Sequence, residues 1–202
     1  MPRFSPRTLL AAASAALAAV LLIAGGLALW GSAYVHNTVQ GQLASQQIFF
    51  PPAAAFAHAK AGTEITPSMI PSVSQYAGQQ MLTGQQAEAY ADHFIAVHIQ
   101  EMGAGKTYSQ LSAESIAQPK NTTLAATVNT VFKGETLRSM LLNAYGWWKV
   151  SQIVYIVSLV LFGLGAVAGL ASAYLFTLGR RPRSGRVAQP SGHEEITPTT
   201  IA

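Results

Sequence analysis

The sequence predicts an all-α membrane protein in which two transmembrane helices flank a mostly helical extracytoplasmic domain. Three observations carry this prediction. Only 10% of the 202 residues are Asp, Glu, Lys or Arg, against roughly 25% in a typical soluble domain. Two long segments contain no charged residue, and no stretch between them alternates as a strand would. Cysteine is absent, which excludes disulfides and thiolate metal sites.

The two charge-free segments are residues 8–35 and 150–178, and each exceeds the about 20 apolar residues that a spanning helix needs. A core helix of a soluble protein is the alternative, and the length of both segments without a charge argues against it. A cleaved secretory signal is the alternative for the first segment, because Gly31-Ser32-Ala33 resembles a cleavage site. Its apolar run is longer than the about 7–15 residues of a signal sequence, so an uncleaved anchor is favoured.

Basic residues at the far ends of both segments predict the topology. Arg3 and Arg7 lie in the N-terminal residues 1–7, and four arginines lie in the polar tail 179–202, which is predicted to be disordered. Because Lys and Arg near span ends favour the cytoplasm, both termini are predicted to be cytoplasmic. Residues 36–149 are then extracytoplasmic. Their six basic and six acidic residues balance, so they offer no basic patch for nucleic acid.

Aromatic residues cluster where each span meets the predicted outer surface. Amphipathic rings concentrate at membrane–water interfaces, so these residues are predicted to be interface anchors. Packing of the same rings within the extracytoplasmic domain is the alternative. The predicted anchors are Trp30, Tyr34, Tyr145, Trp147 and Trp148.

Small residues recur at every fourth position in both spans. Such residues let helix backbones approach closely where lipid supplies no hydrophobic drive. We expect the two spans to pack on each other through these faces, and a docking face for a partner helix is the alternative. The residues are Gly165, Gly169 and Ala173 in the second span and Ala11, Ala15 and Ala19 in the first.

The extracytoplasmic segment is expected to begin and end with outward continuations of the two spans. The first helix should stop at the sequence FFPP, residues 49–52, and the proline-containing segment 51–74 is predicted to be an irregular loop. A final helix is predicted to start near residue 121 and to lead into the second span.

Two further helices are predicted inside this segment. Thr83 and Gln86 have the spacing of a capping box. They should begin an amphipathic helix that ends at Gly103, as helices commonly end at glycine. The apolar stripe of this helix consists of Ala87, Ala91, Phe94, His98 and Met102. A shorter helix is predicted over residues 108–117.

The sequence GAGKT at residues 103–107 resembles a nucleotide-binding P-loop, but its context argues against one. The motif requires a first glycine where Gln100 stands, and it opens a helix, whereas these glycines close one. Gly103 and Gly105 are therefore interpreted as a helix end and a turn.

The histidines do not form a recognisable metal motif. His93 and His98 are five residues apart, about 140° around a helix, so they cannot chelate one ion locally. His98 is predicted to be a core histidine with one hydrogen bond. A site completed by His36 or His58 across the fold is left open, and neither a nucleophile elbow nor a carboxylate pair is found.

Three segments resemble a family of uncharacterised actinobacterial two-span membrane proteins with a helical extracytoplasmic domain. The resemblance implies a bacterial plasma membrane and brings no activity or catalytic residues with it. The segments are QLASQQIFFPP, QYAGQQMLTGQQAEAYADHFIAVHIQEMGAGKTYSQLSAES and FKGETLRSMLLNAYGWW.

Taken together, these features predict a non-enzymatic membrane protein that serves as an accessory or scaffolding subunit of a larger cell-envelope complex. Its expected partners are the lipid bilayer and other membrane-protein subunits, with no cofactor, nucleotide or nucleic acid. The alternative is an extracytoplasmic ligand-binding or sensing module. A metal-dependent enzyme that uses the histidines ranks third.

Overall fold

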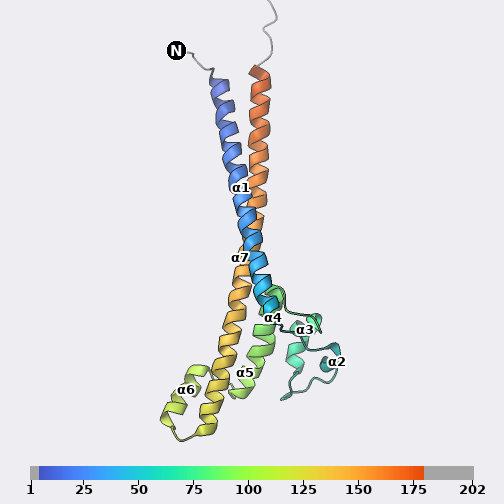
Figure 1. Cartoon of the computed structure of the whole chain (residues 1–202), viewed down its shortest axis with the longest axis vertical. Helices are drawn as coiled ribbons and strands as arrows, with labels where there is room; N and C mark the ends of the chain where they lie inside the picture. Colours follow the sequence, from blue (N-terminus) through green and yellow to red (C-terminus); the bar gives the residue numbers. More distant parts are fainter. Residues whose placement is uncertain (1–4, 180–202) are drawn as a thin grey trace, which may run out of the picture.

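The computed structural model describes residues 5–179, whose secondary structure is helical apart from one isolated antiparallel bridge between Phe49 and Gln80 (Figure 1). The all-α prediction is confirmed for these residues. Arg3 and the tail beyond residue 179, on which part of the topology prediction rests, lie outside them. In chain order the elements are α1 (Pro6–Ser45), α2 (Ala53–Phe56), η1 (Pro67–Met69), α3 (Ile70–Val73), η2 (Ser74–Tyr76), α4 (Gly84–Tyr90), η3 (Ala91–Ile95), α5 (Ala96–Met102), α6 (Tyr108–Ala117) and α7 (Thr122–Gly179).

Two long helices organise the molecule. At 1.5 Å per residue, the 40 residues of α1 extend about 60 Å and the 58 residues of α7 about 87 Å. Figure 1 shows them running side by side as a stalk, with the shorter helices gathered around one half of α7. We call residues 36–149 the head. Neither long helix is interrupted where it enters the head, so both expected outward continuations are confirmed.

Residues at every seventh position, most of them small, form the contact between α1 and α7. A seven-residue step falls only about 20° short of two full turns, so such residues stay on one face of a gently supercoiled helix. The close approach is visible at Gly165, where an added Cβ would lie 3.0 Å from the Leu22 side chain. This seven-residue seam consists of Ala11, Ala18, Gly25, Ser32 and Val39 on α1 and Ser151, Ser158, Gly165 and Ser172 on α7, all buried.

Two seam serines connect the helices by hydrogen bonds. The Ser32 hydroxyl donates to the carbonyl oxygen of Ser151 over 2.7 Å, and the Ser172 hydroxyl donates to the carbonyl oxygen of Ala11 over 2.8 Å. Because the two bonds lie near opposite ends of the seam, they also establish the antiparallel register. Interhelical bonds of this kind contribute roughly 0.6–2 kcal/mol each between helices in lipid.

Capping boxes begin two helices of the head. Thr83 and Gln86 form the predicted box at the start of α4, and Thr107 forms an equivalent box with Gln110 at the start of α6. Each box satisfies two backbone N–H groups that the first turn of a helix leaves without partners. The predicted helix after Thr83 is confirmed and ends before Gly103, although its middle, η3, is a π-helical turn.

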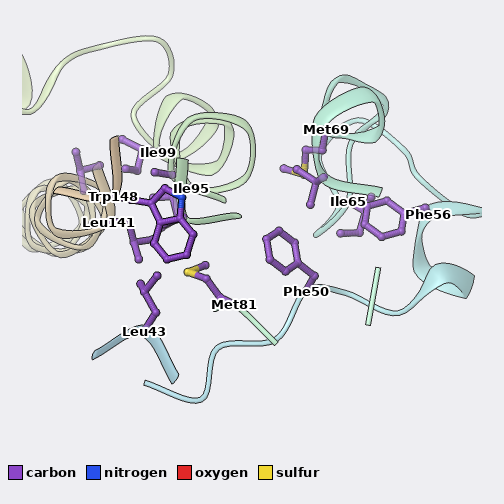
Figure 2. Packing of buried hydrophobic residues seen from close by; sticks show 14 of the residues in the cluster. Leu43, Phe50, Phe56, Ile65, Met69, Met81, Ile95, Ile99, Leu141 and Trp148 are labelled. Atoms are coloured by element: carbon purple, nitrogen blue, oxygen red, sulfur yellow. The ribbon is translucent and has the colours of Figure 1, made fainter. Parts of the chain in front are cut away.

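The core of the head joins both long helices to the connecting segments. Figure 2 shows Leu141 and Trp148 from α7 near Ile95, Met81 and Leu43. On the other side of the cluster, Phe50 faces the residues of the proline-containing segment. Those residues are Phe56, Ile65 and Met69, each at most 9% exposed.

The proline-containing segment 51–74 is more ordered than the sequence suggests. It contains α2, η1 and α3, each only one turn long. Each turn buries one apolar residue in the core, namely Phe56, Met69 or Val73. The prediction of an irregular loop is therefore wrong in part, because tertiary burial fixes turns that local propensity alone does not specify.

Candidate functional site

The apolar exterior of the stalk is the first candidate functional surface. α1 and α7 are both long and apolar enough to cross a membrane, with mean hydropathies of 2.2 and 2.5 over their most apolar windows. Only 17% and 11% of those windows are buried inside the protein. Large side chains such as Ile23, Leu27, Val167 and Leu170 are each at least 65% exposed. Exposed apolar area of this extent marks a surface that lipid or another protein covers.

The small residues of the two spans divide between the seam and the exterior. Ala11 and Gly165 are buried in the seam, and an added Cβ on Gly169 would lie 3.9 Å from Ala18. The other three predicted residues are exposed, because a four-residue step advances about 40° around the helix and soon leaves the contact face. They are Ala15, Ala19 and Ala173.

The five predicted anchor residues lie in different surroundings. Trp30, Tyr34 and Trp147 are 68%, 62% and 53% exposed, and the first two stack with ring centroids 5.9 Å apart. Tyr145 is half-buried, and Lys149 Nζ lies 5.6 Å from the centroid of its ring.

Trp148 does not fit the prediction of an interface anchor. It is only 5% exposed, its ring centroid lies 3.9 Å from that of His36, and the backbone of Gly84 packs against it. The ring is therefore inside the head, where it joins α1, α4 and α7. The sequence pattern Trp147-Trp148 could not separate these roles, because adjacent residues on a helix point about 100° apart.

The GAGKT segment has an architecture unlike that of a P-loop. Gly103 ends α5, and Gly105 has a φ of +80°, which glycine adopts without strain. Lys106 pairs with Glu114, with Nζ–oxygen distances of 2.7 and 2.8 Å, and Thr107 caps α6. The lysine and threonine are thus engaged with α6 in a helix–turn–helix connection.

The histidines are separated in the structure. His93 is exposed, whereas His98 is half-buried and its Nδ1 lies 2.8 Å from the carbonyl oxygen of Phe94. His36 is half-buried and its ring lies tilted against that of Trp148, and His58 is exposed beyond α2. Among residues 5–179, no group of three or more His, Asp or Glu side chains is placed to hold a metal ion.

Asp92 has a structural partner rather than a neighbouring histidine. Its Oδ1 accepts hydrogen bonds from Arg138 Nη2 at 2.7 Å and Nε at 3.2 Å, and Glu135 lies 3.5 Å from the same guanidinium. The Asp92 hydrogen bond is the main cause that raises the pKa of Arg138 above its usual value. This pair links the π-helical turn to α7.

A groove between the α4–α5 run and α7 is the second candidate surface. It has a volume of about 390 Å³ and is largely open to solvent. Its size falls in the range of about 300–1,000 Å³ that is usual for small-molecule sites. We call it the α5–α7 groove, and its lining includes Glu64, Tyr90, Phe94, His98, Met102 and Leu137.

Three rings form a row along one side of the groove. The Tyr90 and Phe94 centroids are 4.6 Å apart, and those of Phe94 and His98 are 4.7 Å apart. The row follows a four-residue step through η3, and π-helical turns occur frequently at functional sites. Burial, and then the negative charge of Glu64, raise the pKa of the Tyr90 hydroxyl above its ordinary value. The sequence stripe contains Phe94, His98 and Met102, but only the fold adds Glu64 and Leu137.

Comparison with known protein families, characterised proteins and solved structures finds no match for the chain. The fold and both candidate surfaces are therefore interpreted from the residues and their geometry.

Proposed function

We propose that the protein is a non-enzymatic integral membrane protein whose two spans hold a helical extracytoplasmic head, and that it serves as an accessory or scaffolding subunit of a larger cell-envelope complex. The observation that supports the proposal is the exposed apolar surface of α1 and α7 along the stalk. Two antiparallel apolar helices of this length fit the hydrocarbon core of a bilayer, where lipid would cover their exposed side chains.

Burial separates this proposal from a soluble helical protein. A core helix of a soluble protein buries most of its apolar residues, whereas at least 83% of each apolar window here is not buried. The seam supports retention of the first span in the mature protein. Cleavage near Ser32 would remove Ala11, Ala18 and Gly25, which pack against α7.

The proposed topology places both termini in the cytoplasm and the head outside. Arg7 lies at the start of α1, on the same end of the stalk as the end of α7, because the helices are antiparallel. Basic residues at that end favour the cytoplasmic side.

A pocket at the junction of stalk and head supports docking of a partner. It encloses about 330 Å³ between α1 and α7, and uncharged residues line it, among them Tyr34, Gln42, Asn143 and Trp147. Apolar and amide side chains of this kind suit a second helix that leaves the membrane beside the stalk. The pocket and the exposed small residues Ala15 and Ala19 both support a partner span that packs against the exterior of the stalk.

Single-cysteine labelling tests the membrane topology. The natural chain contains no cysteine, so each introduced thiol is the only one. Gln118→Cys in the head should react with a membrane-impermeant maleimide in intact cells, whereas Ser5→Cys should react only after permeabilisation. Labelling of both positions in intact cells would contradict the proposed topology.

Co-purification tests the accessory role. The tagged protein, extracted in mild detergent, should bring down a stoichiometric membrane complex that an untagged control lacks. The double substitution Ala15→Leu and Ala19→Leu, on the exposed face of α1, should reduce that recovery, whereas Val20→Leu is the matched control. Recovery of the protein alone, under conditions that preserve other membrane complexes, would contradict the accessory role.

The runner-up function is a ligand-binding head, and the α5–α7 groove is the observation that favours it.

A further inference from the structure

The polar groups around the α5–α7 groove share one electrostatic character. Glu64 contributes a carboxylate, Tyr90 a hydroxyl and His98 an imidazole, and none of the lining residues is Lys or Arg. Within residues 5–179, Glu64 forms no ion pair. Glu64 is exposed, and a carboxylate without an ion-pair partner beside an open apolar groove attracts a cation.

The tautomer of His98 adds a second acceptor. A carbonyl oxygen can only accept a hydrogen bond, so Nδ1 must donate its proton to the carbonyl oxygen of Phe94, 2.8 Å away. In the neutral ring the lone pair then resides on Nε2. Two hydrogen-bond acceptors, the Glu64 carboxylate and His98 Nε2, thus border the same groove.

The remaining lining determines the rest of the ligand. Ile95, Ile99, Met102 and Leu137 provide an aliphatic and thioether wall, and the Tyr90–Phe94–His98 row provides aromatic surface. Methionine adapts to irregular apolar partners and contacts aromatic rings favourably. The lining therefore suits an apolar body with N–H donors at one end.

We propose that the α5–α7 groove binds an organic ammonium ion, a protonated primary or secondary amine with an aromatic or aliphatic body. The ammonium group lies between the Glu64 carboxylate and His98 Nε2, and the apolar body lies against Leu137, Met102 and the aromatic row. This assignment concerns the head alone and stands independently of the accessory role proposed for the spans.

The chemistry distinguishes this ligand class from its competitors. An anion would meet the charge of Glu64 with no cation in the lining to compensate it. A neutral alcohol of the same shape would use the apolar wall but lose the ionic attraction. A quaternary ammonium would keep the charge but has no N–H to donate to His98.

Binding of 2-phenylethylammonium to the full-length protein in nanodiscs tests the proposal. Isothermal titration calorimetry at pH 7, with empty nanodiscs as blank, should show saturable binding. 2-Phenylethanol, the neutral isostere, should bind about tenfold more weakly, which corresponds to about 1.4 kcal/mol. Equal affinity for the amine and the alcohol, or the absence of saturable binding of the amine, would overturn the proposal.

Two variants assign the binding to this groove. Glu64→Gln should weaken amine binding about fivefold while leaving alcohol binding unchanged, since an exposed carboxylate contributes about 1 kcal/mol. Glu88→Gln, which removes a carboxylate of α4 outside the groove lining, should bind like the natural protein. Equal effects of the two substitutions would overturn the assignment to Glu64.

An optical readout places the amine beside the aromatic row. Its positive charge should lower the pKa of Tyr90. The titration of Tyr90 is followed by tyrosinate absorbance, as the difference between the natural protein and Tyr90→Phe. Saturating amine should shift this titration to lower pH. A bound amine that leaves this titration unchanged would contradict the location. Topology labelling of the same Glu64→Gln variant should match that of the natural protein, so failure of this site is separate from failure of the membrane assignment.

Discussion

Gly84 and Trp148 meet so closely that even a methyl group would not fit between them. A Cβ added at Gly84 would lie 2.5 Å from Cγ and 2.9 Å from Cδ1 of Trp148. Both atoms belong to a buried ring that also contacts His36 of α1, so the ring cannot yield as the tip of a long side chain would. The contact anchors the first residue of α4 to the middle of the head core.

We therefore expect Gly84→Ala to destabilise the head by about 1–3 kcal/mol, the usual cost of overpacking a filled core. Thermal unfolding of the full chain in detergent, followed by tryptophan fluorescence, measures the change. Gly146→Ala is the matched control, because nothing lies within 4 Å of an added Cβ there and alanine favours the helix. Equal melting temperatures for the two variants would show that Trp148 is not packed as described.

Tyr90 gives a pH-dependent prediction. Burial and Glu64 raise its pKa in the folded protein above the ordinary value of about 10. Its stabilising contribution is therefore complete below pH 10 and is lost as the pH rises through the folded-state pKa. Denaturant unfolding between pH 9 and about 11 should show a smaller loss of stability in Tyr90→Phe than in the natural protein. Parallel curves for the two proteins would contradict the assigned environment.

The seam between α1 and α7 shows how residue spacing determines the contact between two helices. The four-residue spacing of Gly165, Gly169 and Ala173 predicts one contact face, yet the buried residues of the structure are seven apart. Both spacings are present in the sequence, because small residues are abundant throughout both spans. The choice between them depends on the supercoil that two long helices adopt together, and no single helix contains that information.

Gly165→Leu should force α1 and α7 apart, because an added Cβ already comes within 3.0 Å of Leu22. Gly163→Leu, two residues earlier and with nothing within 4 Å, is the control on the same helix. Spin labels at the exposed positions Leu17 and Leu170 would report the interhelical distance by pulsed electron resonance. The first variant should lengthen or broaden the distance distribution, and the control should leave it unchanged. If both variants leave it unchanged, Gly165 does not lie in a close contact.

Local signals predicted the elements that local interactions build. The capping box at Thr83, the short helix over residues 108–117 and the glycine end at Gly103 are confirmed because each depends on residues within one turn. The turns within residues 51–74 and the burial of Trp148 could not be predicted in this way, since residues distant in sequence cause them.

The groove shows the same limit. The sequence places Phe94, His98 and Met102 on one apolar helical stripe and predicts that His98 is a core histidine. It contained no signal that Glu64, some 30 residues earlier, or Leu137, on another helix, would border the same space. A site assembled from three distant segments becomes visible only in the folded chain.

At the scale of the whole molecule, the head core depends on the inner ends of both long helices. Val39 and Leu43 from α1 and Leu141 and Trp148 from α7 are each at most 5% exposed. The head is therefore not an appendage on a stalk, because the stalk supplies part of its interior.

A fragment of residues 36–149 should fold, because it contains all four of these core residues, whereas a fragment of residues 47–149 should not. Loss of Val39 and Leu43 removes two buried apolar side chains, worth about 1.5–3 kcal/mol each. Circular dichroism melting curves would distinguish a cooperative transition in the longer fragment from its absence in the shorter one. Cooperative unfolding of both fragments would show that α1 is dispensable to the core.

The continuity of α7 has a consequence for reach. Gly134, which lines the α5–α7 groove, stands 16 residues before Val150, or about 24 Å along an unbroken helix. In the proposed topology the continuous helix fixes the distance between the groove and the membrane surface. A dissolved small molecule meets the groove at that height without entering the bilayer. In that proposed topology a lipid headgroup lies below the groove, so we expect the groove to bind ligands from the extracytoplasmic solution rather than from the membrane surface.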